Sequence, residues 1–254
     1  MKLIYCILLF LLFNEVSHSQ TIINAERLGG GADSTIYSVS FLYNGTKGNS
    51  NTDRLNISPA FIFLRKKNEY KLFGDYSLLS AAGKGLLNSG FVHLRHNFKL
   101  TGRIKTFEFY QLQFNDILLL TKREVFGAGL RFSLLNKDSL KFDLGMGLMR
   151  EIELLDETAL LPDELSVTKY YRATSVGSIK WLLSKTITID NVIYYQPYLE
   201  DFTDYRLLND FNLVVSLTSN FGLITSLTTR YDSKPPGSLK TLDNMISFGF
   251  NMKF

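Results

Sequence analysis

The carboxyl-terminal nine residues alternate strictly between apolar and small or polar side chains. Every even position from Ile246 to Phe254 is large and apolar, whereas the odd positions from Ser247 to Lys253 are small or polar. A period of two residues is typical of a β-strand with one apolar and one polar face. This segment therefore predicts a strand that lies between two different environments.

The same alternation recurs along most of the chain and predicts an all-β protein. The alternating runs are about 11 to 16 residues long, whereas strands of soluble sheets usually have about 5–6. Runs of this length can cross a membrane at a tilt. The pattern predicts twelve strands, within a range of 10–14, at 34–44, 54–65, 69–80, 88–99, 103–115, 120–135, 139–151, 167–182, 186–199, 205–218, 221–232 and 243–254.

The predicted connections fall into two classes that largely alternate along the chain. Those after the second, fourth, sixth, eighth and tenth strands are tight turns. Transmembrane barrels separate short periplasmic turns from longer outward loops in this way. We therefore predict a single antiparallel transmembrane β-barrel with both termini in the periplasm. The longer connections are 45–53, 81–87, 152–166 and 233–242, and the short exceptions are 116–119 and 200–204.

The amino terminus has the pattern of a secretory signal peptide. Lys2 is followed by an apolar run from Leu3 to Phe13, and Ser17-His18-Ser19 forms a small-x-small cleavage site. We therefore predict a signal peptide over 1–19, a periplasmic segment over 20–32 and a barrel over 33–254. Cys6 is the only cysteine, so the mature chain would have no disulfide and no thiolate chemistry.

The closing strand also predicts where the chain is inserted. A terminal strand that ends in phenylalanine resembles the recognition signal that bacterial outer-membrane barrels present to their assembly machinery. We therefore expect the outer membrane of a Gram-negative bacterium as the location, with outer-membrane lipid and the barrel-assembly machinery as partners. The mild net charge of +4 gives no indication of a nucleic-acid partner. The expected signal consists of Phe248, Phe250, Met252 and Phe254.

Three consecutive motifs in the middle of the chain carry a family resemblance. An aromatic and glutamine-rich strand covers 108–115, Arg123 precedes a Gly-x-Gly-Leu-Arg strand at 127–131, and a Gly-x-Gly strand at 145–147 ends in Glu151. This order resembles the salt-stress-induced outer-membrane protein family, the domain-of-unknown-function family numbered 481. The resemblance implies an outer-membrane barrel over most of the mature chain and no agreed activity. A link to osmotic or salt stress rests on the family name alone.

Polar and charged side chains collect on the inward face of the predicted strands. Antiparallel neighbours would place Arg123 and Arg131 beside carboxylates of the next strand. Charges inside a barrel must be paired or hydrated, because an isolated buried charge is costly. These residues therefore line a water-filled lumen, where they would set solute preference, or form a structural salt-bridge network. The candidates are Arg95, Gln111, Gln113, Arg123, Arg131, Asp143, Glu151 and Arg172.

The sequence shows no pattern of a catalytic or metal site. His93 and His96 are three residues apart and therefore lie on opposite faces of one strand. No Gly-x-Ser-x-Gly elbow is present, and we expect no catalytic residue, metal or cofactor. An acidic outer loop is expected at 152–166, together with Glu151, and its leucines make a cap or plug one hypothesis for it. Its carboxylates are at 151, 153, 156, 157, 163 and 164.

Taken together, these features predict a narrow passive channel or a structural envelope protein. One alternative is a periplasmic or secreted β protein that binds a lipid or hydrophobic ligand, which would require apolar inward faces. A second is an outer-membrane lipid-modifying enzyme, which needs a nucleophile beside a base. The polar inward faces argue against the first alternative, and the lack of a visible nucleophile–base pair argues against the second. The sequence does not predict the oligomeric state.

Overall fold

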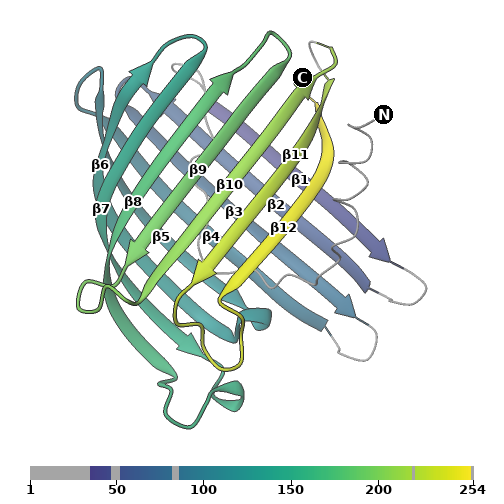
Figure 1. Ribbon diagram of the computed structural model, residues 1–254, viewed down its shortest axis with the longest axis vertical. Helices are drawn as coiled ribbons and strands as arrows, with labels where there is room; N and C mark the ends of the chain where they lie inside the picture. Colours follow the sequence, from purple (N-terminus) through teal and green to yellow (C-terminus); the bar gives the residue numbers. More distant parts are fainter. Residues whose placement is uncertain (1–34, 47–51, 82–85, 219–220, 253–254) are drawn as a thin grey trace, which may run out of the picture.

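The computed structural model describes residues 35–46, 52–81, 86–218 and 221–252. In these residues twelve antiparallel strands form one sheet in sequence order (Figure 1). The predicted fold class and strand number are confirmed. The strands are β1 (Thr35–Thr46), β2 (Thr52–Arg65), β3 (Asn68–Ala81), β4 (Leu86–Lys99), β5 (Ile104–Asn115), β6 (Leu120–Asn136), β7 (Leu140–Leu155), β8 (Val167–Leu182), β9 (Ile187–Pro197), β10 (Tyr205–Ser216), β11 (Phe221–Asp232) and β12 (Leu242–Met252).

The carboxyl end of β7 differs from the prediction. The strand continues to Leu155, where the backbone N–H donates to the carbonyl of Ser166 at 2.8 Å. The prediction of an acidic outer loop is therefore wrong in its first part. Glu151 and Glu153 are buried residues of the strand and face the interior. The chain leaves the sheet only after Leu155 and then forms the 3-10 turn η3 (Glu157–Ala159).

Helical structure is confined, within the described ranges, to two 3-10 turns, η2 (Asp116–Leu118) and η3. No helix in this part of the chain is long and apolar enough to cross a membrane. The side chain of Asn115 caps η2 by accepting the N–H groups of Ile117 and Leu118 at 3.0 and 3.3 Å. This cap turns the chain back so that Leu118 is buried at the end of the sheet.

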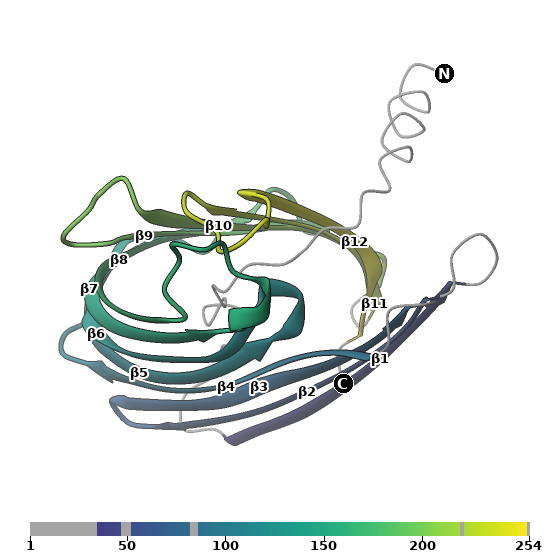
Figure 2. The same cartoon turned by 90° about the horizontal axis from the view of Figure 1, so that it is seen from below.

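The sheet curls round so that β9–β12 lie over β1–β4 (Figure 2). Among the described residues β1 and β12 are not paired with each other, so the barrel has an open seam. Gly129 of β6 and Gly147 of β7 lie directly opposite one another where the sheet curves strongly. A Cβ atom on Gly129 would lie 2.6 Å from the Cα of Gly147. Glycine is therefore required for the close backbone approach at this pair.

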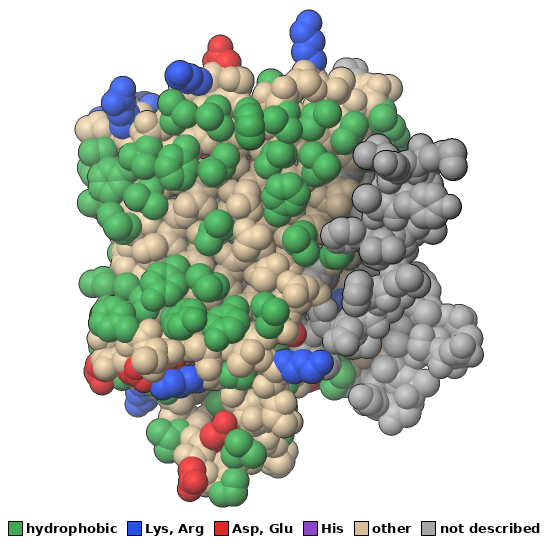
Figure 3. Space-filling model, in the orientation of Figure 1, with side chains coloured by type: hydrophobic (Ala, Val, Ile, Leu, Met, Phe, Trp, Pro, Cys, Tyr) green, Lys and Arg blue, Asp and Glu red, His purple; other side chains and the backbone are tan. Residues whose placement is uncertain are grey.

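The two faces of the sheet differ in chemistry. The convex face exposes large apolar side chains such as Phe126 and Leu148, which are 60% and 61% exposed. Hydrophobic side chains form two bands across the strands, and charged side chains lie towards both ends (Figure 3). The concave face encloses a buried interior of apolar and polar groups. An apolar exterior around a partly polar interior is the arrangement of a membrane barrel.

The predicted assembly signal falls largely outside the described residues. Ile246 of β12 lies opposite Leu227 of β11 and is exposed on the convex face. The side chains of Phe248, Phe250 and Met252 are not described, and neither is Phe254. The predicted signal peptide and periplasmic segment lie outside the described residues as well. All of these stay predictions.

Candidate functional site: an ion-pair network inside the barrel

The most highly charged part of the interior lies towards the end of the barrel that carries the longer loops. Three arginines and four carboxylates meet there, and we call them the interior network. Period-two geometry places each strand residue of the set on the concave face. Every member is at least 90% buried. The members are Arg123 (β6), Glu151 and Glu153 (β7), Arg172 (β8), Asp204 (before β10), Arg206 (β10) and Asp232 (β11).

Glu151 is the centre of the interior network. Its carboxylate accepts from Nε of Arg123 at 2.9 Å, Nε of Arg172 at 3.0 Å and Nη1 of Arg206 at 3.0 Å. The side chain is fully buried, with 0% exposure. Three guanidinium groups on one carboxylate replace the water that an ionised group loses on burial. Glu151 therefore joins three strands that are far apart in the sequence.

The outer carboxylates satisfy the remaining arginine N–H groups. Arg206 donates to Glu153 at 2.9 and 3.1 Å and to Asp232 at 2.8 Å. Arg172 donates to Asp204 at 2.8 Å. Three cations and four anions give the network a formal charge of −1. The arginines are thus fully neutralised, and their planar groups make the paired contacts that favour arginine over lysine.

Part of the interior network joins strands that are not neighbours in the sheet. In the sheet, β7 and β10 are separated by β8 and β9, so Arg206 cannot reach Glu151 and Glu153 along a strand pair. It reaches them across the enclosed space. The buried guanidinium of Arg206 therefore occupies interior space on the concave side of β8 and β9.

Apolar and aromatic side chains fill the interior beside the network. Val176, Val192, Tyr194 and Leu208 form one buried cluster, in which Leu208 has 0% exposure. On the facing wall, Phe107 is also buried. Apolar side chains and ion pairs therefore fill this part of the interior together.

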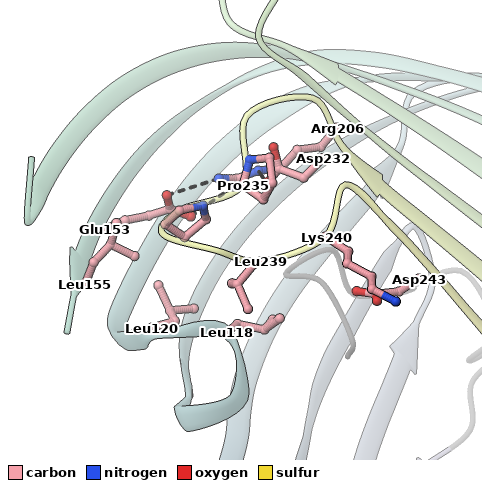
Figure 4. A pocket seen from close by; sticks show the side chains of 11 residues that line it. Leu118, Leu120, Glu153, Leu155, Arg206, Asp232, Pro235, Leu239, Lys240 and Asp243 are labelled. Atoms are coloured by element: carbon pink, nitrogen blue, oxygen red, sulfur yellow. Dashed lines mark hydrogen bonds and ion pairs between the residues drawn. The ribbon is translucent and has the colours of Figure 1, made fainter. Parts of the chain in front are cut away.

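The loops at the same end pack over the interior network. Leu239 of the β11–β12 loop and Leu160 pack against the buried side chains of Leu118, Leu120 and Leu155. A small hollow lies between this apolar group and the network, and ion pairs between Glu153 and Arg206 border it (Figure 4). Of the leucines in the cap hypothesis, Leu155 and Leu160 join this apolar group, whereas Leu154 and Leu161 are exposed.

Two polar contacts hold the loops in place. The N–H of Gly237, a residue with a φ of +61°, donates to the Glu164 carboxylate at 2.8 and 3.0 Å. Lys234 donates to Asp201 at 2.6 Å and so joins the β11–β12 and β9–β10 loops. Hydrogen bonds from Lys234 and Thr203 lower the pKa of Asp201 to about 2. The contact therefore persists in mild acid.

The predicted residues separate into three groups. Arg123, Glu151 and Arg172 belong to the interior network. Gln111 and Gln113 extend it, because Gln111 donates to Gln113 at 3.0 Å and Gln113 accepts from Arg123 at 3.5 Å. The other three residues lie nearer the tight turns. Arg95 stacks over Phe107 at 4.9 Å and donates to Asn97, and Arg131 pairs with Asp143 at 2.9 Å.

Sequence reasoning missed four members of the interior network: Glu153, Asp204, Arg206 and Asp232. A usable signal existed for Glu153, because Ile152 and Leu154 continue the apolar face of β7 beyond residue 151. Arg206 also lies between the outward residues Tyr205 and Leu207 at the start of β10. Its partners could not be found in this way, because they depend on the curl of the sheet.

The two histidines of the described part of the chain lie apart from any cluster of potential metal ligands. No group of three potential ligand side chains that could hold a metal ion occurs there. His93 faces the interior and bonds to Gln111 at 3.0 Å, whereas His96 faces outward and bonds to Glu108 at 2.9 Å. The two histidines lie on opposite faces, as their spacing predicted.

Comparisons with solved structures show the fold. The NanC porin is similar with a TM-score of 0.50 at 11% identity, and the match covers 85% of this chain and 98% of that one. The KdgM porin in complex with disordered oligogalacturonate gives a TM-score of 0.43 at 14% identity, covering 87% and 99% of the two chains. A search of curated proteins gives no significant match.

The comparison with protein families agrees with the motifs in the middle of the sequence. The family described as "Protein of unknown function, DUF481" matches residues 39–254, which include all of β2–β12. The resemblance predicted from the motifs at 108–115, 127–131 and 145–147 is confirmed. The chain belongs to the DUF481 family.

Proposed function

We propose that the protein is an outer-membrane β-barrel with an obstructed interior, which serves as a structural component of the envelope. The observation that carries this proposal is the set of buried ion pairs inside the barrel from Arg206 of β10 to Glu151 and Glu153 of β7. A permanently open channel would need continuous hydrated space through the same level. The link to salt stress stays a prediction.

The convex face supports a membrane location. Outward tyrosines of three neighbouring strands pack together towards the long-loop end: the ring centroids of Tyr195 and Tyr205 are 5.7 Å apart, and those of Tyr205 and Tyr231 are 5.5 Å apart. Aromatic rings at the level of the lipid headgroups are typical of membrane barrels. A soluble protein would leave this band and the apolar side chains beside it in contact with water.

Cysteine labelling tests the location and the orientation. The only natural cysteine, Cys6, lies in the predicted signal peptide. Glu157→Cys places a thiol in the β7–β8 loop, and Lys137→Cys places one in a tight turn; both positions are exposed. A membrane-impermeant maleimide on intact cells should label Glu157→Cys, and should label Lys137→Cys only after lysis. Equal labelling of both variants in intact cells would contradict this orientation.

Liposome swelling tests the obstruction. Protein refolded into liposomes should not accelerate swelling in small sugars above the rate of empty liposomes. Heat-dependent migration in detergent gels confirms that the protein is folded in the same sample. Swelling at a rate that falls with increasing sugar size would show an open pore and overturn the proposal.

A narrow channel is the second candidate. It is favoured by exposed cations that face the interior at the tight-turn end, where the network does not reach. A binding site for a hydrophobic ligand is less well supported. The buried interior includes Lys71, Arg95, Gln111 and Asn212 among many polar groups.

A further inference from the structure

A group of cations surrounds the interior at the tight-turn end, opposite to the interior network. Five consecutive strands each contribute one cation to the concave face. Each cation is an even number of residues away from a buried residue of its own strand, so the two side chains point to the same face. We call this set the basic mouth. Its members are Lys99 (β4), Lys105 (β5), Arg131 (β6), Lys141 (β7) and Lys180 (β8).

The strand register places these cations next to one another. Lys99 lies directly opposite Lys105, and Lys105 lies directly opposite Arg131. Lys141 lies directly opposite Lys180. Like charges directly opposite on neighbouring strands destabilise a sheet. Three such pairs on one face therefore favour a role in which a negatively charged group lies between them.

Carboxylates of the chain neutralise only part of the basic mouth. Asp143 bonds to Arg131 at 2.9 Å, and Asp190 lies opposite Lys180 in the register. Glu69 of β3 pairs with Lys71 at 3.3 Å and also attracts Lys105. With Lys71 included, six cations against three carboxylates leave an excess of three positive charges. The interior network has the opposite balance, with three cations and four carboxylates. The two ends of the interior thus differ in the sign of their charge.

The tight turns add positive charge around the opening. Four exposed lysines lie at the turn tips, and Asp138 is an exposed carboxylate in these turns. Blue side chains are visible at this end in Figure 3, at the top of the view. Such a field attracts anions and raises their local concentration. The turn lysines are Lys66, Lys67, Lys137 and Lys185.

We propose that the basic mouth binds a soluble multivalent anion that carries phosphate or carboxylate groups. The orientation of the side chains selects a soluble ligand over a membrane lipid, because the mouth cations lie on the concave face and lipid would contact the convex face. Ammonium and guanidinium groups spaced along adjacent strands suit a ligand with several anionic groups. The inference is independent of whether the barrel conducts.

Calorimetric titration of the folded, full-length mature protein tests the site. The probe is tripolyphosphate, and the protein is held in a zwitterionic detergent. The site variant combines Lys99→Gln, Lys105→Gln, Lys141→Gln and Lys180→Gln. The matched control removes the same four charges from the turn tips with Lys66→Gln, Lys67→Gln, Lys137→Gln and Lys185→Gln. Heat-dependent gel migration verifies that both variants are folded.

The proposal predicts a binding event in the wild type that weakens at least tenfold in the site variant and less than threefold in the control. Equal weakening in both variants would show a general surface attraction and would overturn it, as would the absence of binding in the wild type. If phosphatidylglycerol in nanodiscs competes with tripolyphosphate, the ligand is a lipid headgroup, and the assignment to a soluble anion is wrong. Failure of this binding test would not change the outcome of the liposome-swelling test, which concerns the obstructed interior.

Discussion

Replacing Arg206 with methionine removes the side chain that bridges the barrel. Arg206 donates to three carboxylates: Glu151 at 3.0 Å, Glu153 at 2.9 and 3.1 Å, and Asp232 at 2.8 Å. Methionine has a similar volume but no charge and no N–H donor, so the loss is mainly electrostatic. Two guanidinium groups would then remain for four buried carboxylates.

The magnitude follows from the burial of these partners. Removing one partner of a buried ion pair costs about 3–5 kcal/mol, because the other charge stays buried without compensation. This corresponds to a folding equilibrium on the order of 10²- to 10⁴-fold less favourable. Arg131→Met is the matched control. The ion pair of Arg131 with Asp143 is only partly buried, because the two side chains are 16% and 28% exposed. An accessible pair of this kind contributes about 0–1 kcal/mol.

The assay is reversible urea unfolding of the protein refolded in lipid vesicles, followed by fluorescence of Trp181, the only tryptophan. Arg206→Met should unfold at a clearly lower urea concentration than Arg131→Met. Adding Glu153→Gln to Arg206→Met should restore part of the loss, because it removes one uncompensated charge. Equal midpoints for the two single variants would refute the view that the interior network stabilises the barrel.

Three further predictions test the curvature and the loops. Gly129→Val should lower the temperature of gel-mobility conversion, because its side chain would collide with the backbone of β7, at a cost of about 1–3 kcal/mol. Leu239→Asp should expose the β11–β12 loop to added protease that spares the wild type, because it places a charge in the apolar cluster. In an NMR pH titration the Asp201 carboxyl should stay ionised until about pH 2, since its pKa is lowered from 3.8. The contact with Lys234 is then present above the ordinary pKa of an aspartate and is lost as the pH falls towards 2. Lys234→Gln should move the titration midpoint of Asp201 towards that ordinary pKa.

The strands could be predicted from the sequence because alternation and turn residues act locally. In β7, Leu144, Met146 and Leu148 point outward while Asp143 and Glu151 point inward. The same parity assigns Arg123 and Arg172 to the concave face, where both are buried. Such patterns assign a side chain to a face, and antiparallel order assigns its neighbours on adjacent strands.

Contacts across the barrel could not be predicted in this way. The pairing of Arg206 with Glu153 depends on how strongly the sheet curls, and β7 and β10 are not neighbours in it. The curl depends in turn on the close approach at Gly129 and Gly147. The packing of Leu239 over the interior likewise depends on loop conformation, which has no simple period in the sequence.

Conductance of single barrels in a planar lipid bilayer tests the central claim most directly. The account predicts that wild-type protein, shown to be folded by its gel mobility, inserts without a steady unitary current at moderate voltage, because the interior network and its apolar neighbours obstruct the lumen. A stable unitary current from the wild type, unchanged in Arg206→Met, would contradict the claim that these side chains close the barrel.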